Sequence, residues 1–313
     1  MTAYRVIDNH TLELVVLKSY RNMANAQKEL NALKAFNKKC GIGEYSDDKI
    51  HKVFIFEPLE PGNGLALFFK KIAADIKNTE IPGDEKLTQF TKAMHVFLLA
   101  QQQLKNLHDK GIIHQDCNFD NFLHDEVSNE VHLIDFDKSI QCFPLENVRQ
   151  FPGTINLSPN EIHSLLKDYK MLILDLVSGH RGGFLLAEQS LDNLPFSVQF
   201  LANEYRQYLE DFSKKLEQGD KSFAFYDAMT KELFLKTECF VGQLKTLKSI
   251  FLLKPQEQTV LQASVGDECD LDFLDMLPSV PTHKENIPPQ QVVLKEVSVN
   301  LEENPTRKPK FGL

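Results

Sequence analysis

The segment Leu104–Ser139 carries four polar residues whose types and spacing suit phosphoryl transfer. His114, Asp116 and Asn121 follow one another closely, and Asp135 directly follows a mostly apolar run. The transition state of phosphoryl transfer is loose and highly charged, so catalysis consists mainly of positioning the reactants and neutralising charge. A carboxylate can orient the acceptor hydroxyl, and the side-chain oxygens of Asn and Asp suit Mg²⁺. Asp116 is therefore the candidate catalytic residue, and Asn121 and Asp135 are the candidate metal ligands.

An isolated His-x-Asp sequence would indicate no more than a polar hairpin between a helix and a strand. Here the pattern LxxLHxxGIIHxDxxxxN is followed in order by LIDFD, which makes a motif of several parts. These residues resemble the catalytic loop and metal-binding turn of the eukaryotic-type protein kinase superfamily. The resemblance implies a bilobal α+β fold that binds ATP and Mg²⁺, with a small β-rich N-lobe and a larger helical C-lobe.

Upstream segments extend this resemblance. The apolar run Leu12–Leu17 predicts a strand that ends on Lys18, similar to the family's VAIK strand, and residues 22–36 have helical periodicity and include Glu29. Taken alone, such a lysine and glutamate are ordinary surface residues. The resemblance implies that Lys18 holds the nucleotide phosphates and that Glu29 braces Lys18.

The sequence KVFIFEPLEPGNGL resembles the family's fifth strand, its hinge and the start of the following helix. By this analogy Phe56 guards the back of the adenine pocket, and the backbones of Glu57 and Leu59 face adenine. Because hinge contacts are backbone hydrogen bonds, these side chains say little about specificity.

Downstream, the segment Phe151–Ile162 resembles the end of an activation segment. Gly153 and Thr154 match its Gly-Thr pair, and Pro159 with Glu161 resemble the end of its APE motif. In the next helix, Asp168 corresponds to the buried aspartate that braces the catalytic loop. A carboxylate favoured by the dipole at a helix start is the other interpretation of Asp168.

Several positions depart from the family pattern. No glycine precedes Gly41, so the glycine-rich loop over the ATP phosphates is missing, and a single hairpin precedes Lys18. Gln115 replaces an arginine, Asn118 stands where a lysine is usual, and Asp137 replaces the glycine of DFG. These departures indicate a reduced N-lobe and a lower expected rate of transfer.

The 313 residues predict one kinase-like domain, residues 1–254, with an N-lobe of about residues 1–60 and a C-lobe of about residues 61–254. Residues 255–313 are rich in proline, glutamine and charge, which predicts a mostly disordered C-terminal tail. Within this tail, residues 267–276 set large apolar side chains among acids, as in a short helix that binds a partner.

Net charge and cysteine usage exclude other classes. The formal charge of −9 argues against general binding to nucleic acid or to anionic membranes. No apolar run reaches the ~18 residues of a membrane span. The five cysteines show no zinc-type spacing, which favours a reducing, cytoplasmic setting, or delivery into a host cytosol.

Three functions compete. The five central polar residues favour an ATP-dependent kinase acting on a protein hydroxyl, of the serine/threonine type, with a protein substrate as partner. The sequence IDFDKS also resembles bacterial sugar and lipopolysaccharide kinases, so a small-molecule or saccharide kinase is the first alternative. The missing glycine loop and the changes at Gln115, Asn118 and Asp137 leave a pseudokinase or scaffold as the second.

Overall fold

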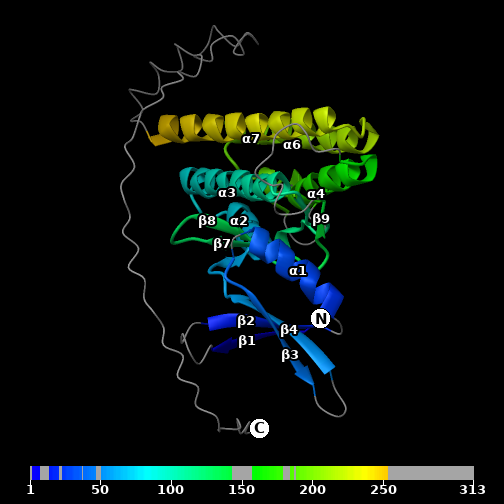
Figure 1. Ribbon diagram of the computed structural model, residues 1–313. Coiled ribbons are helices and arrows are strands. Elements are labelled where there is room, and N and C mark those ends of the chain that lie inside the picture. The colour runs from blue at the N-terminus through cyan, green and yellow to red at the C-terminus, as the bar shows by residue number, and fades with distance from the viewer. Residues whose placement is uncertain are drawn as a thin grey trace, which may run out of the picture. The chain divides into compact units, whose positions relative to one another are not determined.

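Lys18 lies on a four-stranded antiparallel sheet near the N-terminus. The computed structural model describes residues 2–7, 14–20, 23–36, 38–46, 51–142, 157–178, 184–186 and 188–252. The sheet has the order β1-β2-β4-β3 (Figure 1). Its strands are β1 (Thr2–Ile7), β2 (Leu14–Tyr20), β3 (Gly41–Ser46) and β4 (His51–Pro58). The predicted hairpin before Lys18 is confirmed as β1 and β2, while its expected turn at residues 8–10 lies outside the described residues.

Helix α1 (Met23–Ala35) follows β2 and confirms the helix predicted over residues 22–36. One face of α1 is buried, and the helix packs against β4 and β9. The fully buried residues of this face include Glu29, whose carboxylate needs a partner at such a depth. The helix therefore presents an acid to the sheet.

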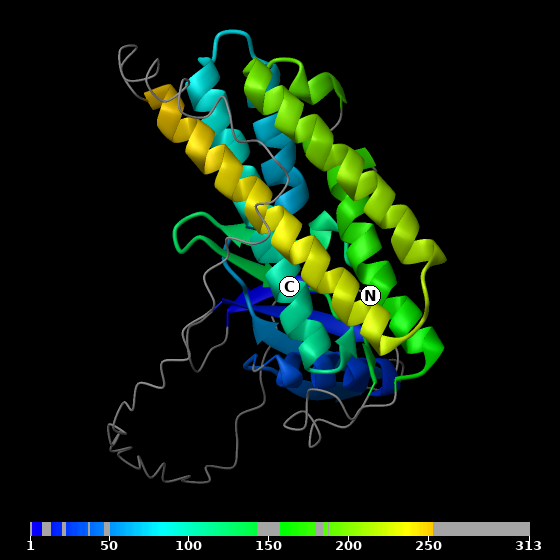
Figure 2. The same cartoon turned by 90° about the horizontal axis from the view of Figure 1, so that it is seen from above.

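Six further helices form most of the described chain. They are α2 (Leu65–Lys77), α3 (Gly83–Asp109), α4 (Pro159–Ser178), α5 (Glu188–Leu191), α6 (Phe196–Gln218) and α7 (Phe223–Leu252). Helix α7 packs along α3 and α6 packs along α4, so that α6 and α7 cover α3 and α4 (Figures 1 and 2). On α6, Tyr205 and Phe212 are buried in the core.

Helix α3 starts earlier than the sequence predicts. The polar stretch between Lys77 and Leu87 predicts a loop, followed by a helix from Phe90 to Lys110, but α3 begins at Gly83. Pro82 occupies the N-cap position, and Asp84 and Glu85 lie in the first turn, where the helix dipole favours acidic side chains. The polar residues are thus the start of the helix rather than a loop before it.

Short strands position the segment that carries the candidate catalytic residues. β5, β7 and β8 form a three-stranded sheet, and β6 pairs with β9. Their bounds are Asn63–Gly64 for β5, Ile112–Ile113 for β6, Phe122–Asp125 for β7, Glu130–Leu133 for β8 and Ile140–Gln141 for β9. The predicted strand before Asp135 is confirmed as β8, and the 3₁₀ turns Phe119–Asn121 and Phe184–Leu186 complete the described elements.

The described chain is a mixed fold of helices and small sheets, compatible with a kinase-like α+β fold. Gly153, Thr154, the tail of residues 255–313 and its acidic segment 267–276 lie outside the described residues. Of the helices in the described part of the chain, none combines the length and the apolar character needed to cross a membrane.

Candidate active site

Lys18 lies at the centre of a cluster of carboxylates. Its ammonium nitrogen Nζ lies 2.5 Å from Oε1 of Glu29, 3.0 Å from Oε1 of Glu57 and 3.4 Å from Oδ1 of Asp135. Lys18, Glu29 and Glu57 are buried, and the side chain of Asp135 is 31% exposed. The fold therefore unites β2, α1, β4 and the segment after β8, although Lys18 and Asp135 lie 117 residues apart in the sequence.

Burial and charge act against each other in this cluster. Burial alone would lower the pKa of Lys18, but Glu57, Glu29 and Asp135 together raise it above its ordinary value. Burial raises the pKa of Glu29 from 4.5 to about 7, with Lys18 opposing the shift. Oε2 of Glu29 is buried and has no hydrogen-bond partner among the described residues, which adds to the cost of its charge. Lys18 is thus held as a cation, whereas Glu29 titrates near neutral pH.

The register of the sheet decides which residues of β4 face Lys18. Lys18 pairs with Ile55, whereas Phe56 pairs with Leu17 and therefore points to the opposite face of the sheet. The prediction that Phe56 guards the back of a pocket beside Lys18 is wrong, because its ring lies half exposed over Gly41. A Cβ at Gly41 would come within 2.0 Å of that ring, so the glycine makes room for it.

Glu57 contributes its side chain, and not only its backbone, to the site. Glu57 lies one position beyond Phe56 and two beyond Ile55, so its side chain is on the same face of the sheet as that of Lys18. Sequence reasoning treated its side chain as uninformative, yet its carboxylate pairs with Lys18. Leu59 is partly buried just after the end of β4, in the segment that leads to β5. The predicted backbone contacts of Glu57 and Leu59 with adenine stay predictions.

Asp116 is held from both sides by amide side chains. Nδ2 of Asn118 lies 3.1 Å from Oδ1 of Asp116, and Nδ2 of Asn121 donates to the backbone oxygen of Asp116 over 2.8 Å. Asn118 also caps the 3₁₀ turn that contains Asn121, because its Oδ1 accepts from the backbone nitrogen of Asp120. The loop therefore fixes Asp116 and Asn121 in one rigid unit.

His114 is a structural member of this loop. Its ring is buried, with Nε2 lying 3.0 Å from the backbone oxygen of Ile134 and Nδ1 accepting from the backbone nitrogen of Asp116 over 3.3 Å. Burial lowers the pKa of His114, so the ring is neutral, and these partners assign its proton to Nε2. His114 thereby ties the residue before Asp135 to the loop that carries Asp116.

Two buried aspartates attach this loop to α4. Asp168 accepts from the backbone nitrogens of His114 and Gln115 over 2.8 and 2.9 Å, and Nε2 of His108 lies 3.1 Å from it. Asp168 lies in the middle of α4, so the bracing interpretation is confirmed and the helix-start interpretation is wrong. Asp175 lies two turns further along the same face of α4 and accepts from the backbone nitrogen of Phe119 over 2.8 Å. The sequence pattern did not point to this residue.

Backbone strain concentrates at the same place. Gln115 and Asp135 have φ angles of 66° and 61°, in the left-handed region that residues other than glycine rarely adopt. Such conformations persist where surrounding contacts hold them, and they cluster at functional sites. Here the hydrogen bond of Asp168 to Gln115 and the contact of Lys18 with Asp135 supply that support.

Lys138 is a further site residue that sequence reasoning missed. Its Nζ lies 2.6 Å from Oδ2 of Asp116, and more than half of its side chain is exposed. The sequence offers one signal for it, since Asn118 stands where the family carries a lysine near the transferred phosphate. Lys138 delivers an ammonium group to the same carboxylate from the turn after Asp135.

The oxygens of this site fit a magnesium nucleotide. The amide nitrogen of Asn121 is already bonded to Asp116, which leaves Oδ1 of Asn121 as a ligand, and the partly exposed Asp135 offers a charged oxygen. Mg²⁺ takes few protein ligands when it also binds phosphates. Within the described residues, no group of three or more His, Cys, Asp or Glu side chains could hold a metal ion by itself. Phosphate oxygens of the nucleotide would have to complete the coordination.

The segment that carries the candidate catalytic residues is also where the chain is similar to a known family. The sequence profile of the lipopolysaccharide kinase (Kdo/WaaP) family matches residues 84–150, which include Asp116, Asn121 and Asp135. No curated protein matches the chain. This family belongs to the protein-kinase-like superfamily. The match therefore supports a phosphotransferase of the kinase type, an atypical relative of the protein kinases.

Proposed function

We propose that this protein is a kinase that uses ATP and Mg²⁺ to phosphorylate a hydroxyl group of a saccharide. The main support for the proposal is that Lys18 contacts both Glu29 and Asp135 beside the loop that contains Asp116. A scaffold without activity would not need to keep two strained backbone positions and a buried cation with three carboxylates. The proposal includes one kinase-like domain, residues 1–254, divided into the two expected lobes.

Each residue has a distinct part in this reaction. Lys18 would bind the phosphates of ATP. Asp116 would orient the acceptor hydroxyl and take up its proton as the acceptor oxygen bonds to the γ-phosphorus, while the bond from that phosphorus to the bridging oxygen breaks and ADP leaves. Lys138 would offset the negative charge that grows between the acceptor oxygen and the transferred group. Asn121 and Asp135 would hold Mg²⁺, which neutralises phosphate charge when bound.

Two observations support a saccharide rather than a protein as the acceptor. The matching family is described as lipopolysaccharide kinases, whose acceptor is a saccharide. The resemblance of Pro159 and Glu161 to the end of an activation segment, which favours a protein acceptor, is weaker in the structure, because Glu161 serves as a helix cap. Its Oε2 accepts from the backbone nitrogen and from Oγ of Ser158 over 2.7 and 2.8 Å, which makes a capping box at the start of α4.

Transfer of labelled γ-phosphate tests the proposal. The full-length chain would be incubated with Mg-ATP and, separately, with neutral sugars, sugar acids, lipopolysaccharide and generic proteins. We expect a labelled saccharide, and no labelling by Asp116→Asn, which keeps the size of the side chain. Labelling of proteins alone would return the function to a protein kinase, and labelling of none would favour a scaffold.

A further inference from the structure

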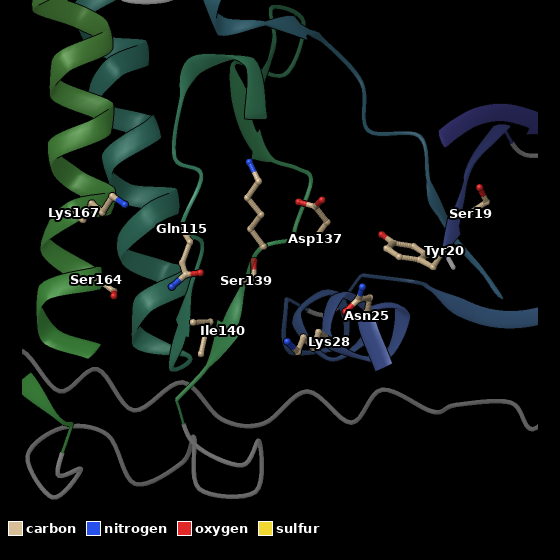
Figure 3. Close-up of a pocket in the computed structure, with 11 residues that line it drawn as sticks. Ser19, Tyr20, Asn25, Lys28, Gln115, Asp137, Ser139, Ile140, Ser164 and Lys167 are labelled. Atoms are coloured by element: carbon tan, nitrogen blue, oxygen red, sulfur yellow. The ribbon is translucent and has the colours of Figure 1, made fainter. Parts of the chain in front are cut away.

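A polar cavity of about 650 Å³ lies beside the candidate active site. Its walls come from β2, α1, the turn after Asp135 and α4 (Figure 3). The described lining residues include Lys138, which contacts Asp116, but not Lys18, Asp116 or Asp135, so the cavity adjoins the proposed site of phosphoryl transfer. Its volume is within the range of roughly 300–1,000 Å³ that small-molecule sites occupy.

Two lysines on opposite walls give the cavity a positive character. Lys28 projects from α1 and Lys167 from α4 (Figure 3). Neither has an ion pair or a hydrogen bond with another described residue, in contrast to the third lining lysine, Lys138, which binds Asp116. Asp137 is the one carboxylate among the described lining residues. Among the described residues, these two ammonium groups thus have no ion-pair partner.

Two hydroxyl groups in the cavity wall lack partners as well. Tyr20 is 8% exposed and Ser139 is 3% exposed, and neither hydroxyl has a hydrogen-bond partner among the described residues. Oδ1 of Asp137 is buried without a described partner too. A buried polar group that stays unpaired is costly, so native structures rarely keep three together without a ligand or water.

We infer that this cavity binds a phosphate ester of a small polyol or sugar. Lys28 and Lys167 supply the charge that a phosphate group requires, and the hydroxyls of Tyr20 and Ser139 supply neutral donors to its oxygens. The hydroxyls of the polyol donate to Oδ1 of Asp137, which an inorganic phosphate ion could not satisfy in the same way. The inference goes beyond the proposed function, because it names a ligand for the cavity that adjoins the site of transfer.

Calorimetric titration without ATP tests this inference independently of any transferase activity. The ligands are glycerol 3-phosphate, inorganic phosphate and glycerol, added to full-length protein that has been treated with phosphatase. Phosphatase treatment removes phosphate groups attached to the protein itself, which would otherwise compete with the added ligand for the cavity. We expect glycerol 3-phosphate to bind more tightly than inorganic phosphate, and glycerol not to bind measurably.

A charge-matched pair of variants locates the site. Lys28→Gln with Lys167→Gln should weaken binding of glycerol 3-phosphate about tenfold or more. Lys70→Gln with Lys236→Gln removes the same charge from exposed helix positions outside the cavity and should leave affinity unchanged. Ser139→Ala should weaken binding roughly threefold, as expected for one lost hydrogen bond.

Three results would overturn the inference. They are failure of the parent protein to bind glycerol 3-phosphate, equal loss of affinity in the two double variants, and binding of inorganic phosphate as tight as that of the ester. Melting curves of both double variants, compared with the parent, show whether each is folded. All the substituted lysines are exposed, so we expect these curves to coincide.

Discussion

The ammonium nitrogen of Lys138 lies 2.6 Å from Oδ2 of Asp116, although the two residues come from different segments of the site. Asp116 belongs to the loop before β7, and Lys138 follows β8. The contact gives the candidate catalytic carboxylate an ammonium partner whose side chain is more than half exposed. The carboxylate proposed to act on the acceptor and the ammonium group proposed to stabilise the transferred phosphate are thus in contact without substrate.

Substitution of Lys138 should therefore reduce catalysis more than binding. We expect Lys138→Ala to lower kcat roughly tenfold or more, because a charge that stabilises the transition state is lost. The KM for ATP should change little, and Lys138→Arg should restore part of the rate. Steady-state kinetics with whichever acceptor the γ-phosphate assay labels measure both constants. An unchanged kcat in Lys138→Ala would show that the contact has no catalytic part.

Substitution of Asp116 should separate chemistry from nucleotide binding. We expect Asp116→Ala to lower kcat by roughly 10²–10⁴ through loss of the base that orients the acceptor hydroxyl. Affinity for Mg-ATP should stay within about threefold, since Asp116 contacts neither Lys18 nor Asp135 in the ion-pair cluster. Single-turnover transfer and equilibrium binding of a fluorescent ATP analogue test the two halves, and equal activity of parent and variant would contradict the assignment.

Substitution of Asp135 should abolish the dependence of ATP binding on Mg²⁺. Asp135 is the charged member of the candidate ligand pair, so Asp135→Ala should remove most of the rise in melting temperature that Mg-ATP gives the parent. For the parent, nucleotide at a hundred times Kd stabilises by about 2.7 kcal/mol. Asp120→Ala, in the same loop, serves as the control. A full Mg-ATP shift in Asp135→Ala would place the metal elsewhere.

The stability of the chain should depend on pH through Glu29. Its pKa lies near 7 in the folded chain against an ordinary value of 4.5, so its favourable contribution is complete below pH 4.5 and is lost as pH rises through 7. Relative to Glu29→Gln, the parent should lose roughly 3 kcal/mol over this interval. Urea unfolding at several pH values measures the difference, with the exposed Glu204→Gln as control. A difference that stays constant with pH would show that Glu29 does not titrate there.

Glu57 should weaken nucleotide binding by competing for Lys18. Glu57→Gln keeps the size of the side chain and removes one of three negative charges around the ammonium group. We expect its Kd for Mg-ATP to fall roughly threefold to tenfold. Equilibrium binding decides this, and a higher Kd in Glu57→Gln would show that Glu57 positions Lys18 instead.

The residues of the site that sequence reasoning identified lie in local patterns. Asp116, Asn121 and Asp135 belong to one continuous motif, and Lys18 and Glu29 each belong to an element that its own periodicity predicts. The structure brings Lys18, Glu29 and Asp135 together, and the hydrogen bonds of the loop hold Asp116 and Asn121. Local patterns were sufficient because each element carries its own side chain to the site.

What the sequence could not supply depends on register and on packing between distant segments. A strand alone does not reveal which of its faces meets a neighbour, so Phe56 was assigned to the face that Glu57 occupies. The contact of Lys138 with Asp116 and the bond of Asp175 to Phe119 arise only when the loop folds against the turn and α4. Side chains that meet in this way leave no periodic signal in the chain.

The attachment of the catalytic loop to α4 has a consequence for exchange with solvent. The amide protons of His114 and Gln115 are both donated to the fully buried Asp168, in the middle of a twenty-residue helix. Hydrogen–deuterium exchange at these two amides therefore requires that the interior around α4 open, and not only that a surface loop fluctuate. Their protection factors thus report the opening free energy of the helical core from within the active site.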